Sequence, residues 1–203
     1  KPLIDFTIEA SLNSRFIDTT YLSSDSEEIL NYGKEKDISI LKRPSKYASD
    51  DSSATQVVLH FYDFLISEGK ILIEEDFYLS YLQPTSPLRN AEILDESFKL
   101  LEGYPDDSII SLVENEHTPY KSFYLDENGL VKSLFDQSLT NQNRQNLKKT
   151  FRANGAIYTF LISKFLSNNG FPSNASKPFI MKSSESLDID SYEDLDALKL
   201  KLS

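Results

Sequence analysis

Leu82-Gln83-Pro84-Thr85-Ser86-Pro87-Leu88-Arg89 is the stretch that decides the fold, because it joins a predicted strand to a predicted helix through unusual polar chemistry. It follows the apolar run 77–81 and precedes a helical pattern that starts near Asn90. The two prolines fix backbone angles and remove two donors, so a rigid connection is expected. A stiff loop alone needs no amide, hydroxyls or guanidinium. Since open α/β sheets bind ligands at the carboxyl ends of their strands, the stretch predicts a site there.

Strands and helices alternate on both sides of this stretch. The chain opens in a helix, because Leu3, Ile4, Ile8 and Leu12 recur at helical spacing. Further strands are predicted at 20–23, 38–41, 108–113, 156–160 and 178–181, with helices between most of them and a closing helix at 192–202. This alternation predicts right-handed βαβ units, and therefore an α/β fold with a mostly parallel sheet.

The composition limits the possible functions. A chain of 203 residues fits one domain with a sizeable core. The net charge of −11 argues against a nucleic-acid or membrane-surface binder, although a few arginines could still bind a small anion. Without cysteine there is no disulfide, thiolate metal site or cysteine nucleophile. No signal peptide or membrane span is visible in the sequence, so a cytoplasmic location is the default expectation.

Polar clusters fall where other strands end. They are Ser23-Ser24-Asp25, Arg43-Pro44 with Asp50-Asp51-Ser52-Ser53 downstream, and Arg152-Ala153-Asn154-Gly155 before a strand. Each has a simpler interpretation as a helix cap, a solvated loop or a turn. Their repeated position at strand ends favours a binding site over unrelated loops.

Asp188-Ile189-Asp190 alternates two carboxylates across one apolar residue. In an extended segment this spacing places both carboxylates on one face, which suits Mg²⁺ with substrate phosphates and water completing its shell. The alternative is a solvated strand end that caps the closing helix. No Ser-His-Asp set, His-x-x-x-His pair or Gly-x-Gly-x-x-Gly loop is present, and His60 lies in an amphipathic helix, which favours a structural role. Phosphate chemistry by positioning and charge neutralisation is therefore the favoured interpretation.

These segments together resemble the acylneuraminate cytidylyltransferases, the CMP-sialic acid synthetases. The resemblance covers nearly the whole chain, from Lys1-Pro2-Leu3-Ile4 to the closing helix. Its motifs are Ser23-Ser24-Asp25, Arg43-Pro44, Ala48-Ser49-Asp50, Leu82 to Arg89, Arg144-Gln145, Phe151 to Tyr158 and Ser186 to Asp190. The shared order and spacing make the match specific, and it implies a Rossmann-like three-layer α/β fold.

The resemblance implies an enzyme that joins CTP to a nine-carbon keto-sugar acid, giving the CMP-sugar and pyrophosphate. It implies Mg²⁺, or Mn²⁺, as the metal. By resemblance, Asp188 and Asp190 hold the metal and act in catalysis with Arg152; Gln83, Thr85, Ser86, Arg144 and Asn154 bind the sugar; Ser24, Asp25, Arg43 and Ser52 bind the nucleotide. An arginine fork matches a carboxylate bidentately, so arginines could also recognise the charge of the sugar.

The alternation of strands and helices breaks down between residues 114 and 150. Asn128-Gly129 predicts a hairpin turn there, and the amide-rich stretch 140–146 predicts exposed loop. In relatives this region is a dimerisation arm that reaches the partner's active site. We therefore expect a single domain over 1–203 with an arm at 114–150, and a homodimer; a surface excursion on a monomer is the alternative.

Family members also carry a strand and a basic Arg-x-Gly-Ser-Lys-Gly loop ahead of the position where this sequence begins. The resemblance therefore predicts that the 203-residue polypeptide alone has little or no activity in CTP-dependent pyrophosphate release. Two alternatives stay open: a non-catalytic binding module of the same fold, and a synthetase for legionaminic, pseudaminic or eight-carbon keto sugars. Asn154-Gly155-Ala156-Ile157-Tyr158 resembles the sialic and legionaminic branch more than the pseudaminic one.

Overall fold

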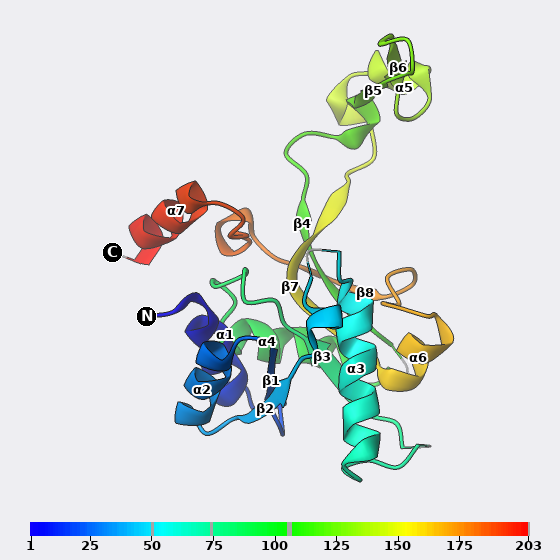
Figure 1. Ribbon diagram of the computed structural model, residues 1–203. Coiled ribbons are helices and arrows are strands. Elements are labelled where there is room, and N and C mark those ends of the chain that lie inside the picture. The colour runs from blue at the N-terminus through cyan, green and yellow to red at the C-terminus, as the bar shows by residue number, and fades with distance from the viewer. Residues whose placement is uncertain (50, 74, 105–106, 203) are drawn as a thin grey trace.

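The computed structural model describes residues 1–49, 51–73, 75–104 and 107–202, and shows an α/β body with a long projecting arm (Figure 1). The helices are α1 Leu3–Asn13, α2 Glu27–Glu35, α3 Ala54–Ser67, α4 Ala91–Phe98, α5 Gln137–Thr140, α6 Ile162–Ser167 and α7 Tyr192–Leu202. The strands are β1 Tyr21–Ser24, β2 Ser39–Lys42, β3 Tyr78–Tyr81, β4 Ile109–Glu114, β5 Phe123–Leu125, β6 Val131–Ser133, β7 Phe151–Leu161 and β8 Lys177–Ile180. The predicted order of strands and helices is confirmed.

The strands of the body form two sheets. A four-stranded sheet has the order β3-β7-β4-β8, in which β7 runs antiparallel to both of its neighbours while β4 and β8 are parallel. The other sheet is the parallel pair of β1 and β2. The α/β class is confirmed, but pairing across β7 is antiparallel, which the βα alternation did not predict.

The same two helices pack against both sheets, one helix on each face. On one face, α1 contributes Ala10 to the cluster around β7 and Ile8 to the cluster with Leu22 of β1. On the opposite face, α3 packs Val58 against Phe160 of β7, and its aromatic rings contact Tyr21 of β1. Helix–sheet–helix packing is the three-layer arrangement expected from the sequence.

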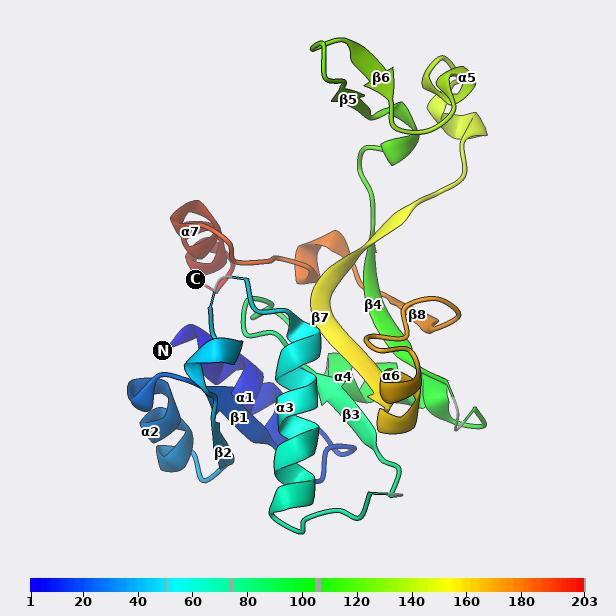
Figure 2. The same ribbon diagram turned by 45° about the vertical axis from the view of Figure 1, so that its right-hand side comes forward.

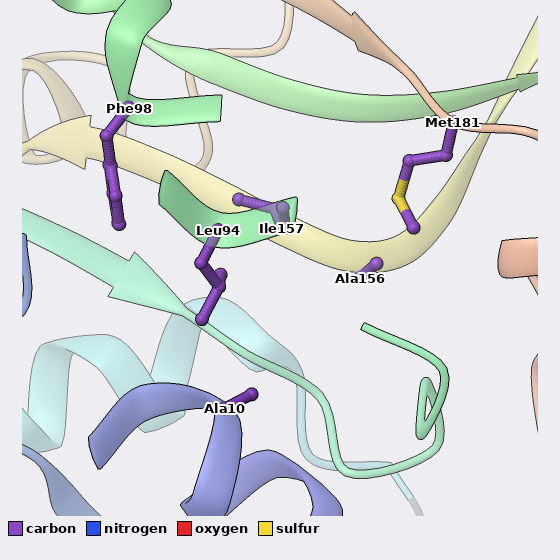
Figure 3. Packing of buried hydrophobic residues seen from close by; sticks show 6 residues of the cluster. All are labelled: Ala10, Leu94, Phe98, Ala156, Ile157 and Met181. Carbon is purple, nitrogen blue, oxygen red and sulfur yellow. The ribbon is translucent and has the colours of Figure 1, made fainter. Parts of the chain in front are cut away.

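The core is centred on β7. Ile157 packs with Leu94 and Phe98 of α4 on one face, as Figure 3 shows. Phe160 packs with Phe165 of α6 on the other face. Positions 157 and 160 are an odd number of residues apart, and successive strand side chains point to opposite faces, so β7 fills both layers of the core.

Three helices begin at a polar N-cap residue. The hydroxyl of Ser26 accepts a hydrogen bond from Ile29 N at the start of α2, and Asn90 accepts one from Ile93 N at the start of α4. Ser53 and Gln56 form a capping box at the start of α3. These caps fix where each helix begins after a strand-end loop.

The arm is formed where β4 and β7 leave the body side by side, and it ends in the β5–β6 hairpin and α5 (Figures 1 and 2). The predicted turn is confirmed: Gly129 has φ +74° and the Asp126 carboxylate accepts from Asn128 N and Leu130 N. The stretch 140–146, predicted as loop, begins at the last residue of α5 and contains the short helical turn Arg144–Asn146. Across the described part of the chain, no helix has the length and apolarity that a bilayer span requires.

Candidate functional site

Residues 83–89, which we call the lip, lie directly against β7. The Ser86 hydroxyl donates to the carbonyl of Asn154 over 3.2 Å. Gly155 has φ +75°, and a β-carbon placed there would lie 2.4 Å from Oε1 of Gln83. The left-handed backbone favours glycine at this position, and an added β-carbon would have to displace the Gln83 amide, which is the far end of a flexible side chain. The strand end predicted to form a site is therefore seated on the Asn154-Gly155 bend of β7.

The lip also holds the segment that carries the two aspartates, residues 186–190, which we call the carboxylate segment. Ile189 N donates to the carbonyl of Thr85 over 2.9 Å. Ile189 is buried, whereas Asp188 and Asp190 on either side of it are exposed. The alternation predicted from the sequence is confirmed, since the apolar residue faces the protein and both carboxylates face outward beside the lip.

The chemistry of this segment fits a hard divalent cation. Its donors are carboxylate oxygens, and no cluster of three or more potential protein ligands occurs among the described residues. Mg²⁺ is commonly held by one or two carboxylates, while substrate phosphates and water supply the other ligands. Asp188 and Asp190 could therefore hold Mg²⁺ together with a nucleotide.

Asn154 lies beneath the lip and its side-chain amide is fully engaged. Its Oδ1 accepts from the Ser111 hydroxyl at 2.6 Å and from Ala156 N at 3.3 Å. Its Nδ2 contacts Met181 Sδ at 3.1 Å and donates to the Ser186 hydroxyl at 2.9 Å. With both lone pairs and both protons used, the amide ties β7 to the start of the carboxylate segment.

Two tyrosines on paired strands form a wall near Asp188. Tyr81 of β3 and Tyr158 of β7 are register partners, and both rings contact Phe171. Burial raises the pKa of Tyr158, and the nearby Asp188 charge raises it further. Burial also raises the pKa of Tyr81, against the opposing effect of Arg43. Arg43 of the small sheet and Asp188 therefore both lie close to this wall. The sequence analysis did not predict either tyrosine as a site residue.

Arg43 emerges at the end of β2 and crosses to β1. Its Nη2 donates to the carbonyl of Ser23 over 3.0 Å, and its backbone N donates to Ser24 O over 2.8 Å. Three buried polar atoms of this region have no hydrogen-bond partner among the described residues: Arg43 Nε and Ser23 Oγ at the strand ends, and Nδ1 of His60 on α3, whose pKa Arg43 influences. An unpaired buried polar group costs about 1–3 kcal/mol, so such a cluster is typical of a site that a ligand completes.

His60 joins this cluster from α3, where the sequence favoured a purely structural histidine. Its ring lies 5.2 Å from the ring of Tyr47. Burial lowers the pKa of His60, Asp63 opposes this effect, and Arg43 and Lys46 add to the lowering. The imidazole is therefore held in its neutral form, able to donate or accept one hydrogen bond at Nδ1.

The other predicted nucleotide residues have local partners. Ser24 Oγ accepts from Ser26 N over 3.1 Å, and Ser52 Oγ accepts from Ser49 N over 3.1 Å. Asp25 is exposed beside Ser24. These contacts match the capping and turn roles that were the simpler interpretation, and a nucleotide role for the three residues stays a prediction. The motif residue Asp50 lies outside the described residues.

Arg144 lies on the arm and Arg152 lies near its root. Arg144 is in a short helical turn beside an open cavity of about 340 Å³ between residues 114–118 and 144–150. Arg152 is exposed near the root of the arm, paired in register with Val113. Both views show the arm projecting away from the body, so a single chain does not bring Arg144 to Asp188 (Figures 1 and 2).

Comparisons of sequence place this geometry among known proteins. Residues 1–195 match the cytidylyltransferase family. A pseudaminic acid cytidylyltransferase of Campylobacter jejuni is 30% identical, over 98% of this chain and 84% of its own length. A CMP-N,N'-diacetyllegionaminic acid synthase of Legionella pneumophila is also 30% identical, over 94% of this chain and 80% of its own length. An N-acylneuraminate cytidylyltransferase of Escherichia coli is 28% identical, over 97% of this chain and 45% of its own length.

A comparison of structures gives the same fold. A CMP:2-keto-3-deoxy-manno-octonic acid synthetase, solved in complex with CTP, superposes with a TM-score of 0.65 at 12% identity, covering all of this chain and 88% of that chain. At this low identity the likeness establishes the fold alone. The Rossmann-like α/β architecture implied by the resemblance is confirmed.

Proposed function

The chain belongs to the cytidylyltransferase family, and from that premise we propose that it joins CTP to a nonulosonic acid, giving a CMP-sugar and pyrophosphate. The relatives that support this proposal are named for pseudaminic, legionaminic and acylneuraminic acids. In the reaction, the anomeric oxygen of the sugar attacks the α-phosphorus of CTP. The bond between that phosphorus and the bridging oxygen breaks, the electron pair leaves with pyrophosphate, and the sugar hydroxyl loses its proton.

One observation carries the proposal: the hydrogen bond of 2.9 Å between Ile189 N and Thr85 O. It fixes the two exposed aspartates beside the polar lip, so the predicted metal ligands and the predicted sugar-binding residues share one edge. Positioned groups of this kind account for most of the catalysis in phosphoryl-type transfer.

The residues divide into three roles in this proposal. Gln83 and Thr85 line the sugar side. Ser86, which was also predicted to bind the sugar, is buried and supports the lip through its hydrogen bond to Asn154 O, and the Asn154 amide holds Ser186 from below. Arg43 lies on the nucleotide side with the unpaired Ser23 and His60 atoms. When Mg²⁺ is bound by Asp188 and Asp190, it would neutralise the charge that develops on the phosphates.

The test is pyrophosphate release by the protein expressed from its whole coding sequence, with CTP and a panel of keto-sugar acids. We expect turnover with CTP and a nonulosonic acid, and none with ATP, GTP or UTP. Binding of CTP without pyrophosphate release from any acid would support the non-catalytic alternative instead. Activity that stays unchanged in EDTA would contradict the metal role of the aspartates.

The sugar itself is the least constrained part of the proposal. The motif at 154–158 favoured the sialic and legionaminic branch, but relatives named for pseudaminic and legionaminic acids are equally identical to this chain. Pseudaminic acid is therefore the second candidate substrate. The ratio of kcat/KM values for the three acids decides between them.

We also propose a homodimer built on the arm. The arm exposes a group of large apolar side chains: Phe123, Tyr124, Leu125, Leu130, Val131, Leu134 and Phe135. Exposed apolar groups of this size mark protein interfaces. A partner would cover them and would receive Arg144 from this arm at its own site. Light scattering coupled to gel filtration tests the dimer.

We also propose that the protein is cytoplasmic, and cell fractionation tests this location.

A further inference from the structure

Arg89 is the last residue of the lip, and its side chain is among the most buried in the protein. It is 1% exposed, which is rare for an arginine. Burial lowers its pKa to about 10, so the guanidinium remains charged at neutral pH. A buried charge is expensive unless its hydrogen bonds compensate, so the partners of this side chain matter.

The partners of Arg89 are two backbone carbonyls and one hydroxyl. Nη1 donates to Gln83 O over 3.2 Å and to Ala156 O over 2.6 Å. Nη2 donates to Thr7 Oγ1 of α1 over 2.6 Å, and Nε has no partner among the described residues. Among the described residues, no acidic side chain forms an ion pair with Arg89 or contributes to its pKa. The guanidinium is therefore arranged to hold backbone in place.

The two carbonyls belong to the two segments that frame the sugar side. Gln83 starts the lip, and Ala156 follows Gly155, on which the Gln83 amide rests. Thr85, two residues after Gln83, accepts the hydrogen bond from Ile189 in the carboxylate segment. A shift of the lip relative to β7 would therefore move the Gln83 amide and the Thr85 carbonyl together.

We propose that Arg89 is a positioning residue for the nucleotidyl transfer, which sets the Gln83 amide and, through Thr85, the carboxylate segment. It acts by binding the Gln83 and Ala156 carbonyls with one nitrogen, so that the lip and β7 keep a fixed separation. This inference rests on the proposed function for its kinetic part. Its structural part concerns only the lip and the carboxylate segment.

The kinetic test compares Arg89→Lys and Arg89→Met with the unchanged protein. Lysine keeps the charge but loses the planar fork, and methionine loses both. We expect Arg89→Lys to raise the KM for the keto-sugar acid about tenfold, with less than a twofold change in the KM for CTP, and Arg89→Met to raise the first KM further. If the KM for CTP rises as much as the KM for the keto-sugar acid, the effect is a general structural one. If Arg89→Lys keeps the KM values of the unchanged protein, only the charge matters. Either result would overturn the proposal.

The matched control is Thr7→Val, which removes the third acceptor of the same guanidinium on the side of α1. We expect it to lower the melting temperature while leaving both KM values within twofold, because that bond leads away from the lip. A rise in the sugar KM as large as that of Arg89→Lys would contradict a role directed at the lip.

Hydrogen exchange gives a readout that does not depend on turnover. The Ile189 amide is protected by Thr85 O, so its exchange in Arg89→Lys should speed up about tenfold, while amides of α3 keep their rates. Unchanged Ile189 exchange would overturn the proposal even if the enzyme is active. If the unchanged protein turns over no keto-sugar acid but Ile189 still exchanges faster in Arg89→Lys, the role of Arg89 is supported and the proposed function is refuted.

Discussion

The lip and the arm both follow a strand of the body, but they differ in which side chains they bury and which they expose. In the lip, the polar Ser86 and Arg89 are buried and bonded to β7. In the arm, the apolar Leu125 is 68% exposed and Val131 is 63% exposed. The difference fits a lip whose geometry is completed within one chain, and it is the reason why we propose that a second chain covers the arm.

The largest effect is expected from Asp190→Asn in the carboxylate segment that the lip holds. The amide removes the negative charge while keeping the shape, so kcat should fall about a thousandfold, several kcal/mol of lost metal-dependent stabilisation. The measurement is pyrophosphate release across a range of Mg²⁺ concentrations. Asp196→Asn is the matched control, because Asp196 is an exposed carboxylate of α7 paired with Lys199, and its loss should leave kcat unchanged. Near-normal kcat in Asp190→Asn would remove Asp190 from the site.

A pair of glycine substitutions compares the lip and the arm directly. Gly155 and Gly129 have φ values of +75° and +74°, but an added β-carbon would meet Gln83 Oε1 at 2.4 Å in the first case and nothing within 4 Å in the second. Both alanine variants should lose about 1–2 kcal/mol of stability from the left-handed backbone. Gly155→Ala should also displace the Gln83 amide.

We therefore expect Gly155→Ala to lower kcat/KM for the keto-sugar acid about a hundredfold, since small displacements of a positioned group have effects of this size. Gly129→Ala should change kcat/KM less than threefold. Chemical denaturation and steady-state kinetics of both variants give the comparison. Equal kinetic losses in the two variants would mean that backbone strain alone, and not the contact with Gln83, explains the glycine.

The contrast also explains what the sequence could predict. Local signals were sufficient for the helices, because the helical pattern expected from Asn90 does begin there, where Asn90 caps α4. The buried Ile189 between two exposed aspartates was equally legible, because strand alternation needs only neighbouring residues.

Contacts between residues far apart in the sequence could not be predicted from it. The antiparallel placement of β7 depends on which strands meet, and spacing along the chain does not encode that choice. Asn154 was predicted to bind the sugar, yet its amide is engaged by Ser111, Met181 and Ser186, which lie 27 to 43 residues away in the sequence. Arg89 was recognised only as part of a motif, because nothing local signals that an arginine will be buried.

Mixing two inactive variants tests whether the arm acts on a partner. If the arm delivers Arg144 to the other chain, a heterodimer of Arg144→Ala with Asp190→Asn contains one site in which both residues are present. Random exchange makes half of the dimers heterodimers with one complete site of two, so activity should return to about a quarter of normal. The assay is pyrophosphate release after subunit exchange. No recovery, despite exchange confirmed by mass spectrometry, would place Arg144 outside the partner's site.

The smallest effect concerns His60, whose pKa lies below its ordinary value because it is buried near Arg43 and Lys46. In the unfolded chain the imidazole binds a proton as the pH falls through about 6.5, whereas in the folded chain it resists until a lower pH. The unfolded state therefore binds more protons in this window, and folding stability falls as the pH is lowered from 7 towards 5.

His60→Gln cannot be protonated, so its denaturation free energy should fall less steeply over that range than that of the unchanged protein. CTP carries negative phosphates that favour the protonated imidazole, so bound CTP should shift the same window to higher pH if the nucleotide lies over the unpaired Nδ1. Identical pH slopes in the two proteins would mean that the buried Nδ1 has no influence on stability, and an unchanged slope with CTP would separate His60 from the nucleotide side of the site.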